Sequence, residues 1–325
     1  MLEQQYLQLL RKLYNKATSD KPVLNDNRTG VKTIALANQT LTHDLSNSEL
    51  PLLYSKKVLV NAIIHELIWM LSGSTNIKYL KDNKVNIWNN WSRPDGELGK
   101  VYGYQMRNWN TLKLLDKDKA YWTSMNPDYE STDLIDSSTF KDKVLVRHTV
   151  DQIKKIEWQL KNNPNDRRIV LNLWNVTDLD EMSLSPCHFA TVFTVIDGKL
   201  NSHLTMRSAD LFLGVPFNVV FYSILTIMLA KLNGLELGEF AVTMVNCHIY
   251  ENHLDAIKTQ LDRISNLDLN VEQHDYYYST FNYLDTIELP TLEFKIKNSV
   301  LDYKFEDLKV NNYKHMSFIK APVAV

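Results

Sequence analysis

The longest apolar stretch of the chain, VVFYSILTIMLA at residues 219–230, constrains the fold more than any other segment. Its twelve residues are too few to cross a bilayer, because a membrane-spanning helix needs about 20 apolar residues. We therefore predict a helix that is buried within a globular core. A chain of 325 residues is long enough to surround such a helix with further layers.

Other helices and strands are expected around this core helix. The spacing of apolar residues predicts helices at 2–17, 59–72 and 151–161. Strands are expected near 33–37, in RRIVLNLWNV, and around 242–250 and 291–304. TVFTVI and KLNSHLTM read as a hairpin whose Asp-Gly turn favours type I′ geometry. Helices and strands are mixed without a regular alternation, which predicts an α+β fold.

Two segments do not follow these patterns. Residues 86–110 are rich in Trp, Gly and Tyr, which suggests a loop that lines a ligand. Residues 110–150 are polar and irregular, so we interpret them as a surface insertion. The prediction is one domain over residues 1–325 that carries this insertion.

The composition limits the functional classes. With a net charge of −2, the chain has no overall basic field, so nonspecific nucleic-acid binding is not expected. Two cysteines, Cys187 and Cys247, provide no disulfide framework, and the N-terminal helix does not have the pattern of a signal peptide. The chain therefore reads as a reduced, cytoplasmic protein. No HExxH motif is present, and we expect no metal.

The stretch LSPCHFATVF places Cys187 directly before His188 at the start of an expected strand. The pair could be a nucleophile with its base, or Cys187 could be a half-buried structural residue. Neighbouring residues of a strand point to opposite faces, so His188 is a poor base for Cys187. If Cys187 is a nucleophile, nearby cations must lower the pKa of its thiol.

Four arginines suggest where such cations lie. Arg28, Arg167, Arg168 and Arg207 occur in the motifs NDNRTG, NDRR and MRSAD. Each alone reads as a solvated surface residue. Together with Ser208 they suit a dianionic phosphate, because guanidinium groups and a hydroxyl supply several charge-assisted donors.

Glu66 is the single carboxylate in the apolar helix LVNAIIHELIWMLS. It is either a solvent-facing residue or a buried functional group. Its neighbours Ile63, Ile64 and Leu67 make full exposure improbable. A buried carboxylate costs several kcal/mol unless it is paired or protonated, which favours a functional role.

Several long motifs, in order, resemble those of the thymidylate synthase superfamily: HELIWMLSGSTN, GKVYG, NDRR, SPCH, MRSADLFLGVPFN, CHIYENH and IKAPVAV. The resemblance runs from Tyr6 to Val325, apart from the insertion. It implies a homodimeric α+β fold whose sheets form the subunit interface. The implied reaction is transfer of one carbon from 5,10-methylenetetrahydrofolate to carbon 5 of a pyrimidine nucleotide.

The resemblance also implies roles for individual residues. Cys187 adds to carbon 6 of the pyrimidine, Glu66 organises water and moves protons, and Tyr102 assists removal of the carbon 5 proton. The implied nucleotide contacts are Arg28, Arg207 and Ser208 to the phosphate, Arg167 and Arg168 to the phosphate from the partner subunit, and His248 and Tyr250 to the sugar. The implied folate contacts are Trp88, Trp91, Asp210, Leu213, Gly214, Phe217 and Ala324, the last in a tail that closes over the folate.

Asn218 is implied to select the base. An amide offers both a donor and an acceptor, so it can pair with O4 and N3–H of uracil. Related phage dCMP hydroxymethylases place Asp at this position, so Asn218 predicts dUMP as the substrate. A helix N-cap is the structural alternative for the same residue.

Two products are compatible with the shared chemistry. Synthases usually have other residues where this chain has Leu59, Met106, Val192 and Met206 and the stretch MVNCH, and MRS and RTGVKT resemble the phage hydroxymethylase pattern. The leading hypothesis is therefore a phage-like dUMP hydroxymethylase that makes 5-hydroxymethyl-dUMP in the host cytoplasm. The alternative is a divergent thymidylate synthase that releases dTMP and dihydrofolate, supported by the complete tail and by Trp88. A third hypothesis is an inactive nucleotide- or RNA-binding relative.

Overall fold

The predicted core helix is present as α6, Gly214–Leu232. It is long and apolar enough to span a membrane by composition alone, but 78% of its most apolar window is buried inside the protein. Burial on all sides is typical of the core helix of a globular protein. The computed structural model describes residues 2–116, 126–136, 142–265 and 288–324.

The described chain forms two compact units. Unit 1 comprises Met1–Leu67, Cys187–Thr191 and Val195–Val325, and unit 2 comprises Ile68–Pro186 and Val192–Thr194. Each unit is described separately below. The expectation of a single domain over the whole chain stays a prediction.

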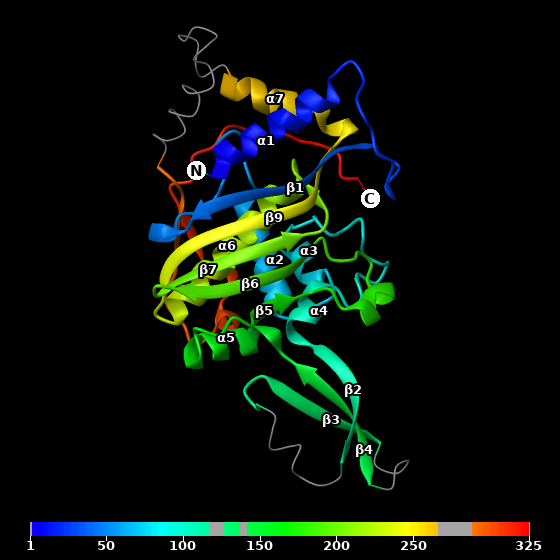
Figure 1. The fold of residues 1–325 in the computed structure, drawn as a ribbon, viewed down its shortest axis with the longest axis vertical. Helices are drawn as coiled ribbons and strands as arrows, with labels where there is room; N and C mark the ends of the chain where they lie inside the picture. Colours follow the sequence, from blue (N-terminus) through cyan, green and yellow to red (C-terminus); the bar gives the residue numbers. More distant parts are fainter. Residues whose placement is uncertain (1, 117–125, 137–141, 266–287, 325) are drawn as a thin grey trace. The chain divides into compact units, whose positions relative to one another are not determined.

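A mixed β-sheet dominates unit 1 (Figure 1). The strands of this sheet that lie wholly or partly in unit 1 are β1 (Thr33–Asp44), β6 (His188–Ile196, with Val192–Thr194 in unit 2), β7 (Lys199–Met206), β8 (Ala209–Asp210) and β9 (Glu236–Tyr250). They follow the path β1-β9-β7-β6, with β8 beside β9. β9 pairs antiparallel with β1 and parallel with β7 and β8, so the sheet is mixed as the α+β prediction requires.

The hairpin between β6 and β7 confirms the predicted turn. Asp197 and Gly198 have φ values of 52° and 77°. Positive φ at both central residues defines the type I′ turn, whose twist matches that of the flanking strands.

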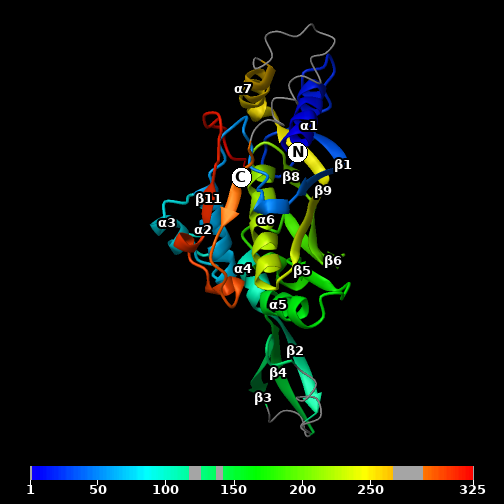
Figure 2. The same ribbon diagram turned by 90° about the vertical axis from the view of Figure 1, so that its left-hand side faces the viewer.

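Helices cover the sheet of unit 1. α6 packs against β9 (Figure 2) and β7, and Leu204, Met206, Val242 and Met244 of these two strands are buried. α1 (Leu2–Ala17) packs against β1 and α7 (Leu254–Ser265). The apolar residues whose spacing predicted α1 are buried: Leu2, Tyr6, Leu9, Leu10 and Leu13.

The C-terminal strand is much shorter than expected. β10 covers only Thr291–Glu293 and pairs with β11 (Lys309–Asn311), whereas the sequence suggested a strand over 291–304. Ser299 and Asp302 form a capping box that begins a 3-10 turn at Val300–Asp302 (η6). A polar residue that caps a turn competes with strand pairing, which explains the early end.

Unit 2 contains the helices α3 (Lys78–Asp82), α4 (Tyr102–Arg107) and α5 (Gln152–Asn162), the strand β5 (Ile169–Asn172) and the 3-10 helix η3 (Val176–Glu181). α2 (Val60–Leu71) begins in unit 1 and ends in unit 2. α5 starts after Asp151, whose side chain caps Lys154 N, in agreement with the predicted helix. α4 lies inside the stretch that was expected to be a loop. It was not predicted because its six residues are too few to show a helical period.

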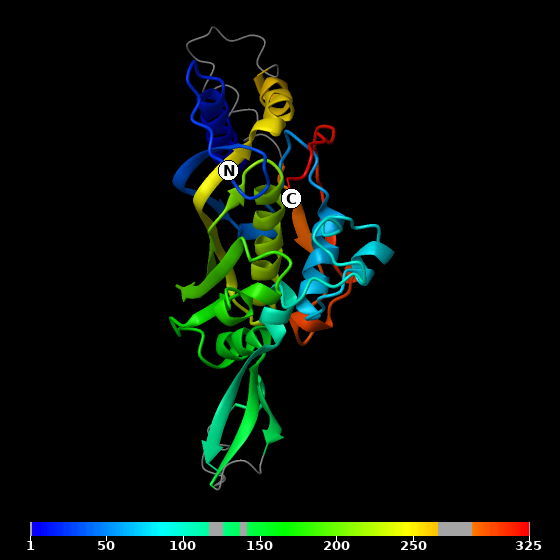
Figure 3. The same cartoon turned by 90° about the vertical axis from the view of Figure 1, so that its right-hand side faces the viewer.

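The insertion is regular where the structure describes it. β2 (Trp109–Asp116), β3 (Glu130–Asp136) and β4 (Lys143–Val150) form an antiparallel sheet in the order β2-β4-β3 (Figure 3). Leu115, Val144 and Val146 form a buried cluster on this sheet. The expectation of an irregular segment was therefore wrong for these residues, because alternating apolar residues in WNTLKLLD and KVLVRHTV favour strands. Residues 117–125 and 137–141 lie outside the described part of the insertion.

Candidate active site

Cys187 lies directly before β6 and beside the end of β7. Arg207 N donates to Cys187 O at 2.9 Å, and Arg207 Nη2 lies 4.0 Å from Cys187 Sγ. Burial raises the pKa of the Cys187 thiol, the charges of Arg207 and Arg28 lower this pKa, and Asp210 raises it. The net shift is upward. The expected cations are therefore present, but they do not outweigh burial.

His188 turns away from the thiol, as its place on a strand predicts. Its Nδ1 lies 2.8 Å from the Tyr222 hydroxyl on α6, and its ring lies edge-on to Tyr222. Complete burial lowers the pKa of His188 to about 3, so the ring is neutral. His188 is therefore a core residue that connects β6 to α6, and the prediction that it is a poor base for Cys187 is confirmed.

The predicted phosphate ligands occupy loops in both units. In unit 1, Arg28 is exposed, and Arg207 and Ser208 are half-buried between β7 and β8. In unit 2, Arg167 and Arg168 are exposed between α5 and β5, and Arg168 Nε donates to Asp166 Oδ1 at 2.9 Å. Arg28 and Arg207 share the surroundings of Cys187, since both lower its pKa.

Three further candidates meet where β8 pairs with β9. Asp210 is the register partner of His248, and Leu211 N donates to His248 O at 2.8 Å. The His248 ring lies edge-on to Tyr250 with 5.2 Å between the centroids, which confirms that both side chains occupy one face of β9. Burial lowers the pKa of His248 and raises that of Tyr250. Cys187 and Asp210 also raise the pKa of Tyr250, so these groups share one electrostatic environment.

The first turns of α6 carry the next group. Asp210 Oδ1 accepts from Phe212 N at 3.0 Å and from Leu213 N at 3.2 Å. A Cβ on Gly214 would lie 3.7 Å from Asp210 Cβ and 3.8 Å from Asn218 Nδ2, so Gly214 separates these two side chains. The N-cap of α6 is Leu213, and Asn218 lies inside the helix. The N-cap alternative for Asn218 was therefore wrong.

Glu66 on α2 is buried, as its apolar neighbours predict, with 8% of its surface exposed. Its charge contributes to raising the pKa of Tyr222, an effect dominated by the burial of that hydroxyl. The Glu66 carboxylate is therefore close enough to the buried Tyr222 hydroxyl for its charge to affect the pKa of that group.

The aromatic candidates of unit 2 form a cluster. Tyr102 is 2% exposed and Trp88 is 7% exposed, and their rings lie edge-on with 5.6 Å between centroids. Trp91 lies 5.8 Å from Trp88, and its buried Nε1 has no hydrogen-bond partner. A buried indole N–H without a partner leaves a donor for a ligand. Phe217 and Ala324, expected to contact the same ligand, are half-buried in unit 1.

A match to known proteins covers almost the whole chain. The family model described as thymidylate synthase matches residues 4–325. A protein named thymidylate synthase from Vesicomyosocius okutanii subsp. Calyptogena okutanii (strain HA) is 38% identical over 322 residues, which is 99% of this chain and 99% of that protein. The chain belongs to the thymidylate synthase family. The resemblance seen in the sequence is therefore confirmed at the level of the family.

Sequence reasoning missed two buried residues near Asp210, the first of which is Lys56. Lys56 Nζ donates to Phe212 O and lies 3.6 Å from the centroid of the Phe212 ring. Burial lowers the pKa of Lys56 to about 7, and Asp210 opposes this shift. The second is His253, discussed below. No sequence signal separates Lys56 from its exposed neighbour Lys57.

Close backbone contacts fix the segment around Tyr102. Gly99 has φ +76°, and a Cβ there would lie 1.8 Å from Glu181 O. A Cβ on Gly103 would lie 2.8 Å from Met70 O. Only glycine fits both positions, so the GKVYG motif is required by packing on either side of Tyr102.

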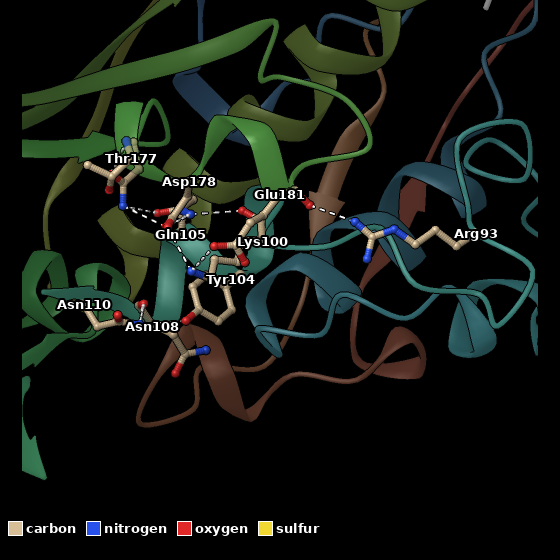
Figure 4. A network of polar contacts seen from close by, with 10 residues as sticks. Arg93, Lys100, Tyr104, Gln105, Asn108, Asn110, Thr177, Asp178 and Glu181 are labelled. Carbon is tan, nitrogen blue, oxygen red and sulfur yellow. Dashed lines mark hydrogen bonds and ion pairs between the residues drawn. The ribbon is translucent and has the colours of Figure 1, made fainter. Parts of the chain in front are cut away.

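A polar network extends this support (Figure 4). Asp178 on η3 is buried and accepts from Lys100 Nζ at 3.0 Å, from Gln105 Nε2 at 2.9 Å and from Asn175 Nδ2 at 2.9 Å. Lys100 Nζ also donates to Glu181 Oε1 at 2.8 Å. Gln105 lies on α4 and Lys100 lies just before it, so one carboxylate anchors the helix that begins with Tyr102.

Among the described residues, no group of three or more His, Cys, Asp or Glu side chains could hold a metal ion.

The network predicts a large effect of Asp178→Ala on stability. Loss of the carboxylate removes one acceptor from each of three donors, which keep only Glu181 Oε1, Lys100 O and Gln105 Oε1. We expect the free energy of unfolding to fall by about 2 kcal/mol in chemical denaturation. Asp180→Ala, an exposed carboxylate on the same 3-10 helix, should change it by less than about 0.5 kcal/mol. Equal effects of the two variants would show that the network does not stabilise the fold.

The contact with Arg207 predicts a change in the reactivity of Cys187. The thiolate is the reacting form, and removing the cation raises the thiol pKa further. Arg207→Gln should therefore slow alkylation of Cys187 by iodoacetamide about threefold to tenfold near neutral pH, and shift its pH midpoint upward. The control is Arg147→Gln on the exposed side of β4, and mass spectrometry of peptides separates Cys187 from Cys247. An unchanged midpoint in Arg207→Gln would contradict the assignment.

Proposed function

We propose that the protein is a thymidylate synthase, which converts dUMP to dTMP and 5,10-methylenetetrahydrofolate to dihydrofolate. The observation that carries the proposal is the match over 99% of both chains to a protein named thymidylate synthase. The position of Cys187 beside Arg207 supports it, because a cation near the sulfur favours the thiolate that the proposed chemistry requires. The chain therefore acts as a transferase of nucleotide biosynthesis.

Cys187 acts as the nucleophile in this proposal. Its thiolate forms a bond to carbon 6 of the uracil ring, and the electron pair of the ring double bond moves toward O4, which makes carbon 5 nucleophilic. Carbon 5 then bonds to the folate methylene carbon as the bond from that carbon to folate N10 breaks. Tyr102 assists loss of the carbon 5 proton, and Glu66 moves protons at the pyrimidine oxygen. Loss of this proton expels tetrahydrofolate at N5 and leaves an exocyclic methylene group on carbon 5. Hydride transfer from tetrahydrofolate to this methylene group yields the methyl group and dihydrofolate, and Cys187 leaves as the ring double bond re-forms.

The nucleotide is held by the polar groups around Cys187. Arg28, Arg207 and Ser208 bind the phosphate, whose two negative charges suit guanidinium donors. His248 and Tyr250 bind the sugar hydroxyl, which is supported by their common face on β9. Asn218 pairs with O4 and N3–H of uracil, and its position inside α6 means that its amide does not serve as the N-cap of this helix.

The folate is proposed to contact residues that offer flat walls and a few polar atoms. Trp91 supplies a buried N–H without a partner, and Asp210 supplies a carboxylate that can accept from the pterin. The full proposed set is Trp88, Trp91, Asp210, Leu213, Gly214, Phe217 and Ala324.

A homodimer is proposed from the open face of the sheet in unit 1. Phe240, Val242 and Met244 of β9 are buried on one face, whereas Val245 on the other face is 45% exposed. A large sheet face with exposed apolar residues favours burial against a second copy. In this arrangement Arg167 and Arg168, exposed in unit 2, are donated to the phosphate of the partner subunit.

We also propose a cytoplasmic location, as the cysteine content suggests.

The second candidate is dUMP hydroxymethylase, favoured by Leu59, Met106, Val192 and Met206. Met106 is 0% exposed and Met206 is 1% exposed. Side chains buried to this extent are part of the packed interior, which is consistent with a role in packing. Leu59 and Val192 are 40% and 36% exposed, respectively. The named relative also favours the synthase. The hydroxymethylase and phage hypotheses stay predictions, as does the inactive binding relative.

Product analysis tests the proposal. We expect incubation with dUMP and 5,10-methylenetetrahydrofolate to release dTMP and dihydrofolate in equal amounts, measured by mass spectrometry and by dihydrofolate absorbance. Cys187→Ala should abolish the activity, and Cys247→Ala, the matched buried control, should retain most of it. A product heavier than dTMP by one oxygen atom, with no dihydrofolate, would establish the hydroxymethylase instead.

A further inference from the structure

His253 is a fully buried histidine between β9 and α7, with 0% of its surface exposed. It lies in the 3-10 turn Glu251–His253 (η4). Its Nε2 lies 2.7 Å from Pro322 O in the C-terminal segment. A carbonyl oxygen only accepts hydrogen bonds, so Nε2 carries the proton and donates it to Pro322.

The other ring nitrogen of His253 faces a site residue. Nδ1 is buried without a hydrogen-bond partner, and it lies 3.9 Å from Asp210 Oδ1. Phe212 and Tyr250 pack against the ring, with centroids 5.6 Å and 5.3 Å away. One imidazole ring therefore lies between the C-terminal segment and the carboxylate that we propose for the folate.

The C-terminal segment has a second attachment that does not involve His253. Arg263 of α7 donates to Ser317 O and to Ser317 Oγ, both at 2.7 Å. Met316 N donates to Tyr54 O at 2.7 Å. These contacts hold the segment several residues before Pro322, so they leave the last residues to be positioned separately.

Pro322 is an unusual anchoring point. Proline has no N–H, so its carbonyl is the only backbone group at this residue that can form a hydrogen bond. The ring of Pro322 restricts φ, so rotation about ψ sets both the direction of its carbonyl and the path of the following residues, and a hydrogen bond to this carbonyl restrains that rotation. Val323 after it is 49% exposed, so burial contributes little to holding the end of the chain.

We propose that His253 is a positioning residue that latches the C-terminal end of the chain through Pro322 and couples that end to Asp210. The proposal rests on the proposed function in one respect, namely that Asp210 and the C-terminal end both contact the folate. Phe212 connects the two, because its N donates to Asp210 Oδ1 and its ring packs against His253, so a folate that moves Asp210 also moves the ring that holds Pro322. The latch itself is a property of unit 1 and does not depend on turnover.

The first test measures the C-terminal end without any reaction. A carboxypeptidase removes terminal residues only when the end of the chain is released. We expect release of the last residues to be about tenfold faster in His253→Phe, which keeps an aromatic ring but loses the donor. His253→Gln, whose amide nitrogen can donate in place of Nε2, should stay within about threefold of the wild-type rate.

The control is His43→Phe. His43 is also buried and its Nε2 lies 3.3 Å from a backbone carbonyl, Glu49 O, but it belongs to β1. The His43→Phe substitution should leave the rate of carboxypeptidase release unchanged, although it also removes a contact between a buried histidine and a backbone carbonyl. Equal release in wild type and His253→Phe would overturn the latch, as would equal acceleration in His43→Phe.

The second test concerns the reaction. The KM for 5,10-methylenetetrahydrofolate should rise about tenfold in His253→Phe while the KM for dUMP stays within about twofold. In a chain that lacks residues 322–325, the same substitution should have no further effect on folate affinity, measured by binding with the nucleotide present. Additive effects in the shortened chain would overturn the coupling. A protein that makes no dTMP but still shows faster release in His253→Phe would refute the proposed function and keep the latch.

Discussion

The environment of Cys187 is set by two opposing effects, and the arrangement of unit 1 around it depends on both. Burial favours the neutral thiol, and the charges of Arg207 and Arg28 favour the thiolate. Burial is the larger effect here, so the net shift of the thiol pKa is upward. Because the thiolate is the reactive species, the two arginines act in the direction that favours reaction.

The sheet of unit 1 brings these groups together from distant parts of the sequence. Cys187 precedes β6, Arg207 follows β7, Asp210 ends β8, and His248 and Tyr250 end β9. Because β9 runs parallel to β7 and β8, the C-terminal ends of these strands lie at the same end of the sheet. α6 starts from the same edge and presents Gly214 and Asn218 beside Asp210. The site is thus a consequence of strand direction.

Local patterns in the sequence predicted what depends on local interactions. The period of α1, the apolar length of α6 and the Asp197-Gly198 turn each predicted the element that formed. The short α4 and the early end of β10 were not predicted, because neither helical period nor strand pairing shows in so few residues. The strands of the insertion were not predicted, because their alternating apolar residues are few among many polar residues.

The site divides along the same line. The outward turn of His188 followed from strand geometry, and the burial of Glu66 followed from its apolar neighbours. Cys187 was a candidate from the stretch LSPCHFATVF, whereas Asp210 and Tyr102 were proposed for the site only through family motifs, which encode long-range contacts that spacing alone does not reveal. Lys56 and His253 were missed because their burial depends on Phe212 and Pro322, residues far away in the sequence. Net charge likewise gave no indication of the local cations around Cys187.

A covalent adduct tests the central claim, that Cys187 attacks a uracil ring, most directly. A dUMP analogue with fluorine at carbon 5 has no proton to lose there, so the adduct with enzyme and folate accumulates. Intact-mass measurement of the protein with this analogue and 5,10-methylenetetrahydrofolate should show one nucleotide and one folate added, and peptide mapping should place both on the peptide that contains Cys187. An unmodified mass, or an adduct on the peptide that contains Cys247, would contradict the account.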